Sequence, residues 1–115
     1  MALVHPTPTD ANGNAGASEL LGLAVLEAMA SGCPVIISNT ASLPELIEPE
    51  VSGIAIEPND SAAIASALAR LRGDAELWAR LALSGRRRVE ADFTWTRTVE
   101  RCFAAYRTAA MGAGL

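Results

Sequence analysis

Glu27 is a single carboxylate within an otherwise uncharged stretch that runs from Leu20 to Ala30. A lone acidic side chain is rarely buried without a partner, because removing its charge from water costs several kcal/mol. The vicinal diol of a sugar would suit this carboxylate, since each hydroxyl hydrogen bond to a charged group contributes about 1.5–3 kcal/mol. The residues alone leave two alternatives open, in which Glu27 faces solvent at a rim or pairs with an arginine.

Glu19 precedes the same stretch, separated from Glu27 by seven residues. A helix is expected to begin near Gly22, which places Glu19 in the loop before it. Leu20, Leu21 and Gly22 would then offer free backbone N–H groups at a helix N-terminus, an arrangement that suits a phosphate or an anionic sugar nucleotide. Acidic residues are also favoured near helix N-termini by the helix dipole alone. The spacing of the two glutamates is therefore a weak signal by itself.

Charge and cysteine usage exclude several classes of function. The formal net charge of −4 gives no reason to expect a nucleic-acid partner. Cys33 and Cys102 form no metal-binding spacing, and no signal peptide is recognised, so reduced thiols in a cytoplasmic protein are expected. The basic run from Arg86 to Arg88 is expected to be a solvated helix face, with contact to a membrane surface as the less favoured alternative.

His5 and the aromatic residues have structural interpretations that we prefer. His5 ends the first expected strand, on the side where ligands gather in open α/β sheets, but it has no evident acidic or thiol partner. Four aromatic side chains fall on helical stripes and are predicted to be core rather than a stacking platform. They are Trp78, Trp95, Phe103 and Tyr106.

The 115 residues suit one domain with strands and helices in alternation. The expected elements are strands at residues 2–5, 35–38 and 53–56, a helix at 21–31 that Gly32 stops, a short helix at 42–47 opened by a Ser42 to Glu45 capping box, and helices capped by Asp60, Asp74 and Thr94. This order predicts an α/β fold with a parallel, Rossmann-like sheet and flanking helices. Three strands are few for such a sheet, so we expect half of a doubly wound domain at 1–108 and a frayed tail at 109–115.

Several motifs together resemble the retaining glycosyltransferases of the GT-B fold, and more narrowly glycosyltransferase family 4, group 1. The pattern of that family runs roughly E-G-F-G-L-x-x-x-E-A-M-A-x-G-x-P-V, followed by a strand, a turn and P-E. The matching positions are Glu19, Glu27 to Ile36, Leu43-Pro44-Glu45, Gly53, Pro58 and Asp60, Phe93 to Trp95, and Tyr106. The resemblance implies that residues 1–108 are the second half of the C-terminal, nucleotide-sugar-binding domain.

The resemblance also implies roles for individual residues. Glu27 would hold the ribose hydroxyls of the nucleotide, and Glu19 would face the donor sugar as the catalytic residue near the reacting centre. Backbone amides around Leu21, Gly22 and Leu23 would contact the sugar hydroxyls and the distal phosphate. The implied reaction transfers a sugar from a nucleoside diphosphate to an acceptor with retention of anomeric configuration, without a metal ion or other cofactor.

The sequence departs from the family pattern in ways that leave the donor sugar, the base and the acceptor open. Leu20 and Leu21 stand where the family has glycine and an aromatic residue, and Ala41-Ser42 replaces Gly-Gly. The loop at residues 7–18 is long and is expected to be a mobile flap. The acceptor domain and the cations that neutralise the diphosphate have no counterpart here, so we expect weak donor binding and no measurable transfer by this chain alone. A non-catalytic nucleotide-sugar-binding module or a protein-interaction module is the alternative.

The strand from Ala2 to His5 would be central in the sheet of the family but lies at an edge in this chain. An uncovered apolar strand edge invites pairing with another chain. We therefore expect self-association, or pairing with a missing N-terminal half, through this strand.

Overall fold

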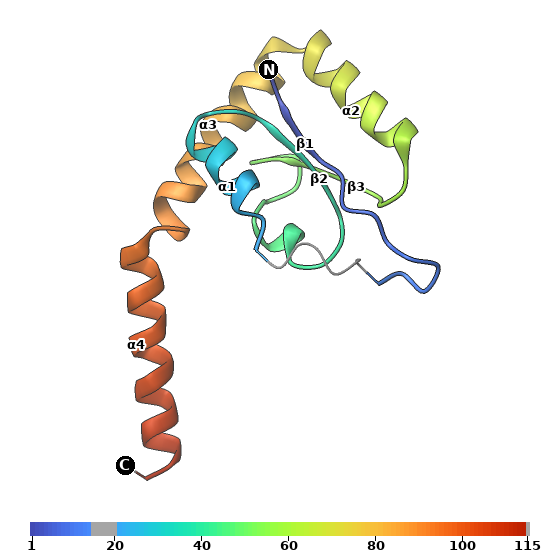
Figure 1. Cartoon of the computed structure of the whole chain (residues 1–115). Coiled ribbons are helices and arrows are strands. Elements are labelled where there is room, and N and C mark those ends of the chain that lie inside the picture. Colours follow the sequence, from blue (N-terminus) through green and yellow to red (C-terminus); the bar gives the residue numbers. More distant parts are fainter. Residues whose placement is uncertain (15–20, 115) are drawn as a thin grey trace.

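The computed structural model describes residues 1–14 and 21–114. Its centre is a parallel sheet of three strands in the order β1-β2-β3, formed by β1 (Leu3–His5), β2 (Val35–Ser38) and β3 (Ile54–Ile56) (Figure 1). Val4 lies opposite Ile36, and Ile37 lies opposite Ala55. The predicted α/β class with a parallel sheet and flanking helices is confirmed.

β2 is the central strand, and all of its residues are buried. Its β-branched side chains alternate between the two faces of the sheet, as strand geometry requires. Val35 and Ile37 pack with Val25 and Met29 on one face. Ile36 joins a second cluster on the opposite face. Two separate apolar layers therefore hold the sheet, which explains why the strand is a continuous apolar run.

Three of the described helices cover the sheet. The sequence predicts where the first of them ends and where the other two begin. On one face α1 (Leu23–Ala30) ends before Gly32, whose φ of 71° continues no helix. On the other face α2 (Ser61–Gly73) and the start of α3 (Ala75–Asp92) pack together. Asp60 and Asp74 accept hydrogen bonds from the backbone N–H groups of the first turns of α2 and α3.

The segment from Ser42 onward differs from the prediction of a capping box and a helix through Ile47. It is a single 3₁₀ turn, η1 (Leu43–Glu45), and Ser42 provides no side-chain cap. Arg88 of α3 donates hydrogen bonds to the carbonyl oxygens of Glu45 and Leu46, at 3.1 and 2.8 Å. A continuing helix would have needed those carbonyls for its own backbone.

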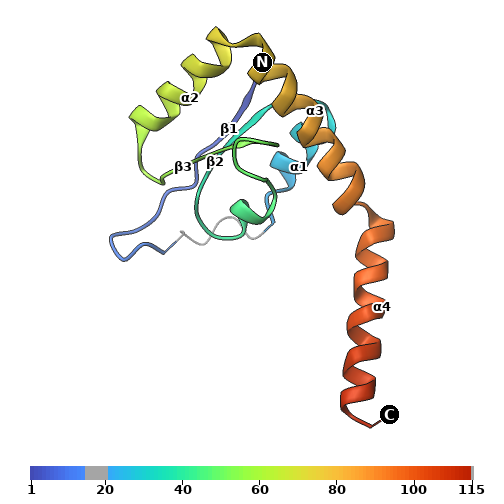
Figure 2. The ribbon, with the colours of Figure 1, turned by 180° about the vertical axis from the view of Figure 1, so that it is seen from behind.

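α4 (Trp95–Gly112) projects away from the sheet and its covering helices (Figures 1 and 2). None of its residues is buried, and Trp95, Phe103 and Tyr106 are 85%, 64% and 70% exposed. The prediction that these aromatic residues are core is therefore wrong for α4, because helical periodicity defines an apolar face without saying that anything covers it. α4 also continues past Ala109, where we expected a frayed tail.

Candidate functional site

The outer face of α1 forms one wall of a cavity of about 490 Å³. Helical periodicity turns Val25 and Met29 towards the core and leaves the opposite face of the helix exposed. The cavity is lined by Leu21, Leu23, Leu26, Glu27 and Ala30 at α1, by Leu46, and by Asp92, Phe93, Trp95, Thr98 and Arg101 at the junction of α3 and α4. This volume lies within the range of small-molecule sites.

Glu27 is exposed and faces this cavity. Among the hydrogen bonds and ion pairs of the described residues, none involves its carboxylate, and the cavity's Arg101 is paired with Asp92 at 3.6 Å instead. Glu27 does not line the separate cavity of about 340 Å³ at the carboxyl ends of the strands, where Ser38 and Ile56 lie. The carboxylate is thus available to a ligand at a rim beside α4. Its exposure also agrees with the alternative from the sequence, in which Glu27 faces solvent at a rim.

Gly22 shapes the N-terminus of α1. Its φ of 62° is left-handed, and a Cβ atom there would lie 2.6 Å from Leu46 Cδ1 and 3.0 Å from Leu43 Cδ2. α1 has no side-chain cap, and the N–H groups of Leu23 and Ala24 have no acceptor among the described residues. The N-terminus of α1 therefore presents amides that no described residue accepts from, next to the cavity wall at Leu23 and the 62% exposed side chain of Leu21.

Glu19, the predicted catalytic residue, lies outside the described residues, as does the second part of the predicted flap. The described beginning of that flap is anchored to the body. The Thr7 N–H donates to Ser38 Oγ at 2.9 Å, and Asn59 Nδ2 donates to the Thr9 carbonyl oxygen at 2.9 Å. Backbone N–H groups also donate to the Asp10 carboxylate, chiefly that of Asn14, and lower its pKa.

Two arginines beside the cavity were missed by sequence reasoning, which expected no cation in the site. Arg88 contacts the carbonyls of η1, lies over the Phe93 ring at 5.8 Å, and is 3.9 Å from the Asp92 carboxylate. Arg88 and Arg101 line an adjoining cavity of about 340 Å³ together with Leu21. The basic run from Arg86 to Arg88 was expected to be a solvated helix face. This holds for Arg86, which pairs with Glu90 on the surface, but not for Arg88, which is half-buried. A signal in the sequence was the spacing of Arg88 and Asp92 at i,i+4.

His5 and the cysteines show no arrangement that could ligate a metal ion. Within residues 1–14 and 21–114 no group of three or more His, Cys, Asp or Glu side chains is close enough to hold one. His5 Nδ1 lies 3.4 Å from Thr7 Oγ1. In the same described ranges, no helix is both long and apolar enough to cross a bilayer.

A family model described as glycosyl transferases group 1 matches residues 3–88, so α4 lies beyond the matched range. The D-inositol 3-phosphate glycosyltransferase of Salinispora arenicola is 37% identical over 97 residues, which cover 84% of this chain and 21% of that protein. The sucrose synthase of Acidithiobacillus caldus is 39% identical over 87 residues, covering 72% and 11%. The chain spans about a fifth or less of the length of these curated relatives.

Solved structures share the fold. The sucrose-phosphate synthase of Thermosynechococcus elongatus superposes with a TM-score of 0.69 at 35% identity, covering 80% of this chain and 23% of that one. The Anabaena protein Alr3699/HepE, solved in complex with UDP, gives a TM-score of 0.71 at 24% identity, covering 84% and 26%. At that identity the second likeness concerns the fold alone.

Proposed function

The chain belongs to the group 1 glycosyl transferase family, and on that premise we propose that it forms part of the donor site of a nucleotide-sugar-dependent glycosyltransferase. More narrowly, we propose a retaining family 4 enzyme of the GT-B fold, of which this chain is the C-terminal half of the nucleotide-binding domain. The sheet, the cavity beside α1 and the motif residues at both ends of that helix support this proposal.

Glu27 carries the proposal, because its carboxylate faces a cavity and no described residue bonds to it. The two oxygens can accept hydrogen bonds from both ribose hydroxyls of a nucleotide. The amides of Leu23 and Ala24, which have no acceptor among the described residues, lie about one helical turn away, roughly 6 Å along the axis. A nucleoside diphosphate is long enough to place its ribose at the carboxylate and its phosphates near these amides.

The remaining roles follow from this arrangement. Backbone amides around Leu21, Gly22 and Leu23 would donate to the distal phosphate and to sugar hydroxyls, where the positive end of the helix dipole favours anionic groups. Glu19, three residues before Gly22 in the sequence, would face the donor sugar as the catalytic residue. The bond between the anomeric carbon and the diphosphate oxygen breaks, and the nucleoside diphosphate leaves. The acceptor hydroxyl forms its bond on the same side of the sugar and gives its proton to the departing diphosphate. No metal ion or other cofactor is required in this proposal.

We expect the 115-residue chain by itself to bind its donor weakly and to transfer no measurable sugar. It matches about a fifth of the D-inositol 3-phosphate glycosyltransferase, so most of that relative's length has no counterpart in it. Arg88 and Arg101 are both engaged by Asp92, which leaves little positive charge for a diphosphate. Robust turnover by this chain would contradict the expectation.

The substitution Glu27→Gln tests the donor site. Ligand-observed NMR titration should detect UDP and UDP-glucose binding to the wild-type chain, since these are the ligands held by the Anabaena protein of similar fold. The substitution should weaken that binding about 10- to 30-fold, because two charge-assisted hydrogen bonds become neutral ones. Glu76→Gln, on an exposed surface at the far end of α3, is the matched control and should leave binding unchanged. If Glu27→Gln binds as the wild type does, the ribose role is wrong.

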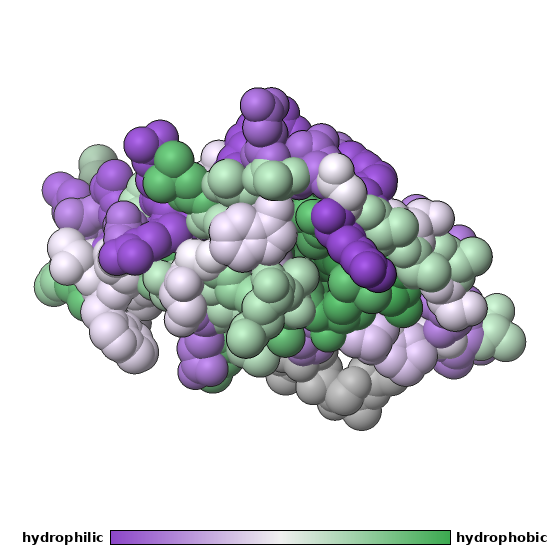
Figure 3. Space-filling model, turned by 90° about the horizontal axis from the view of Figure 1, so that it is seen from above, coloured by the Kyte–Doolittle hydropathy of each residue, from purple (hydrophilic) through white to green (hydrophobic). Residues whose placement is uncertain are grey.

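A protein-interaction function is the second candidate, and the β1 edge favours it. β1 pairs only with β2 among the described strands, so no described strand pairs with its outer edge. A hollow of about 270 Å³, lined by Ala2, Leu68, Leu71 and Trp78 among others, lies beside the start of β1. Apolar side chains gather at the centre of the face seen from above, with hydrophilic ones around them (Figure 3). We propose a second copy of this chain as the partner at this edge, through parallel or antiparallel strand pairing.

Light scattering over a range of protein concentrations tests the pairing at β1. The wild-type chain should form a dimer whose fraction rises with concentration. Val4→Pro removes a backbone donor from the edge strand and should abolish the dimer, whereas Arg107→Ala, on the exposed surface of α4, should not. A wild-type chain that stays monomeric at high concentration would rule this candidate out.

A further inference from the structure

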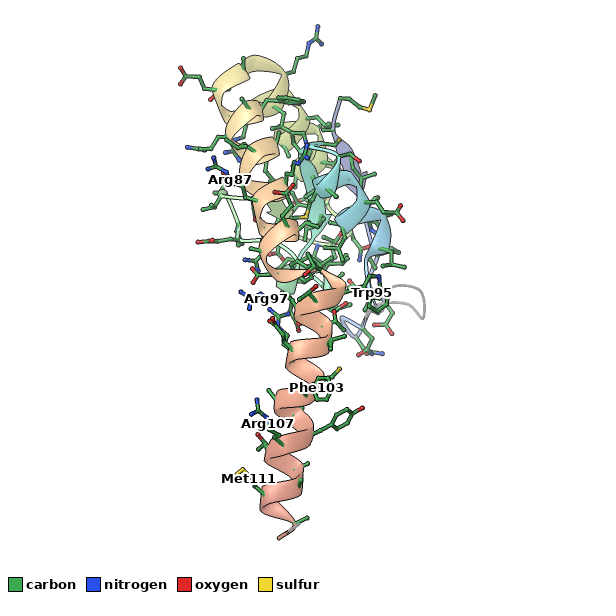
Figure 4. The ribbon with its side chains drawn as sticks, turned by 90° about the vertical axis from the view of Figure 1, so that its left-hand side faces the viewer. Arg87, Trp95, Arg97, Phe103, Arg107 and Met111 are labelled. Atoms are coloured by element: carbon green, nitrogen blue, oxygen red, sulfur yellow. The ribbon has the colours of Figure 1, made fainter. Side chains whose placement is uncertain are left out.

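Trp95 combines exposure with a place in the wall of the cavity that holds Glu27. Its side chain is 85% exposed at the first residue of α4, where the helix leaves the body near α1 (Figure 4). An indole that faces water leaves a large apolar surface uncovered. Packing into the core therefore does not explain why a tryptophan stands at this position. Trp95 is thus a large planar side chain on the same cavity as the Glu27 carboxylate, which pairs with no described residue.

We infer that Trp95 is a stacking platform for the nucleobase of a bound nucleotide, an assignment that rests on the proposed donor site. A nucleotide joins a planar π-system to a vicinal diol, and the cavity offers an indole and a carboxylate for those two groups. The rest of the wall is mostly apolar, from Leu23, Leu26 and Phe93 among others. That lining suits the faces of a base and has few polar groups that would distinguish one base from another.

The other exposed aromatic residues of α4 do not share this position. Phe103 and Tyr106 lie further along the helix, are 64% and 70% exposed, and do not line the cavity. In Figure 4 Phe103 lies well along the projecting helix, away from α1, whereas Trp95 lies at its root. The two side chains therefore have similar exposure but different surroundings, which makes Phe103 a matched control for Trp95.

The base itself is the part of the ligand that Trp95 should recognise. Stacking depends on the π-face and tolerates any base, so UDP and ADP should both use the platform. Ribose 5-phosphate has the diol and a phosphate but no base, so its binding should depend on Glu27 and not on Trp95. This difference separates stacking from a general loss of the cavity.

The experiment compares Trp95→Ala with Phe103→Ala in the full 115-residue chain, with UDP, ADP and ribose 5-phosphate as probes. Trp95→Ala should weaken UDP and ADP binding about 5- to 150-fold, the loss expected when one base-stacking aromatic is removed. It should leave ribose 5-phosphate binding unchanged, and Phe103→Ala should leave all three unchanged. Circular dichroism of each variant checks the fold.

A fluorescence measurement gives an independent readout. The chain has two tryptophans, so Trp78→Phe leaves Trp95 as the reporter. UDP should quench its emission along the same titration curve that NMR reports. If UDP binds and depends on Glu27 while Trp95→Ala and the emission are unaffected, the stacking inference is overturned and the donor site stands. If no nucleotide binds even at millimolar concentration, both are overturned.

Discussion

Replacement of Gly22 by alanine should destabilise the fold more than its small size suggests. Gly22 has a φ of 62°, and the left-handed conformation costs an alanine about 1–2 kcal/mol. The added Cβ would also lie 2.6 Å from Leu46 Cδ1 and 3.0 Å from Leu43 Cδ2. Leu43 is fully buried and Leu46 nearly so, which limits how far either can move. Overpacking of this kind costs about 1–3 kcal/mol, so we expect a total loss of about 2–5 kcal/mol.

Gly32→Ala is the matched control for this substitution. Gly32 has a similar φ of 71°, but no atom lies within 4 Å of the position that its Cβ would take. Gly32→Ala should therefore lose only the free energy of the left-handed backbone. The difference in the free energy of unfolding between the two variants then measures the packing against η1. Urea unfolding followed by circular dichroism measures both free energies of unfolding. If Gly22→Ala is no less stable than Gly32→Ala, the contact between the α1 N-terminus and η1 is not as tight as the distances imply.

Two further predictions concern Arg88 and the ion pair of Arg70 with Glu50. Arg88→Ala should lower the free energy of unfolding by about 1–3 kcal/mol, because two backbone carbonyls of the η1 segment lose their donor, whereas the surface substitution Arg86→Ala should have little effect by the same urea assay. The hydrogen bond from Arg70 lowers the pKa of Glu50, so the pair contributes stability above the unfolded pKa of Glu50 and loses it as the pH falls through the folded pKa. Because both side chains are about half exposed, the contribution is about 0.2–1 kcal/mol, and Glu50→Gln should flatten this part of the acid unfolding profile. An unchanged profile at low salt would contradict the role of the pair.

The parts of the fold that local chemistry controls were predictable. The β-branched run of β2 gives a buried strand, and Gly32 ends α1, because each feature depends on neighbouring residues in the chain. Asp60, Asp74 and Thr94 cap their helices through hydrogen bonds to residues three positions later, which sequence spacing alone defines. The alternation of these elements then leaves a parallel sheet as the arrangement expected for the chain.

The site was predictable only in part. The spacing and resemblance drew attention to Glu27 and to the amides after Gly22, and the structure locates Leu21, Leu23 and Glu27 on one cavity. The roles of Glu19 and Glu27 remain proposals. The cavity's other wall comes from the junction of α3 and α4, far away in the sequence, and no local pattern predicts that Asp92 and Arg101 meet there.

The sequence by itself determined which residues share a face: Val25 with Met29 on α1, and the aromatic stripe that starts at Trp95 on α4. Only the tertiary structure decided which of those faces is covered, because burial depends on what packs against a helix and not on its periodicity. The face of α1 that bears Val25 meets the sheet and becomes core, whereas α4 meets no layer and its stripe stays exposed. The same reason explains Arg88, whose direction is set by the η1 carbonyls that the fold brings to it.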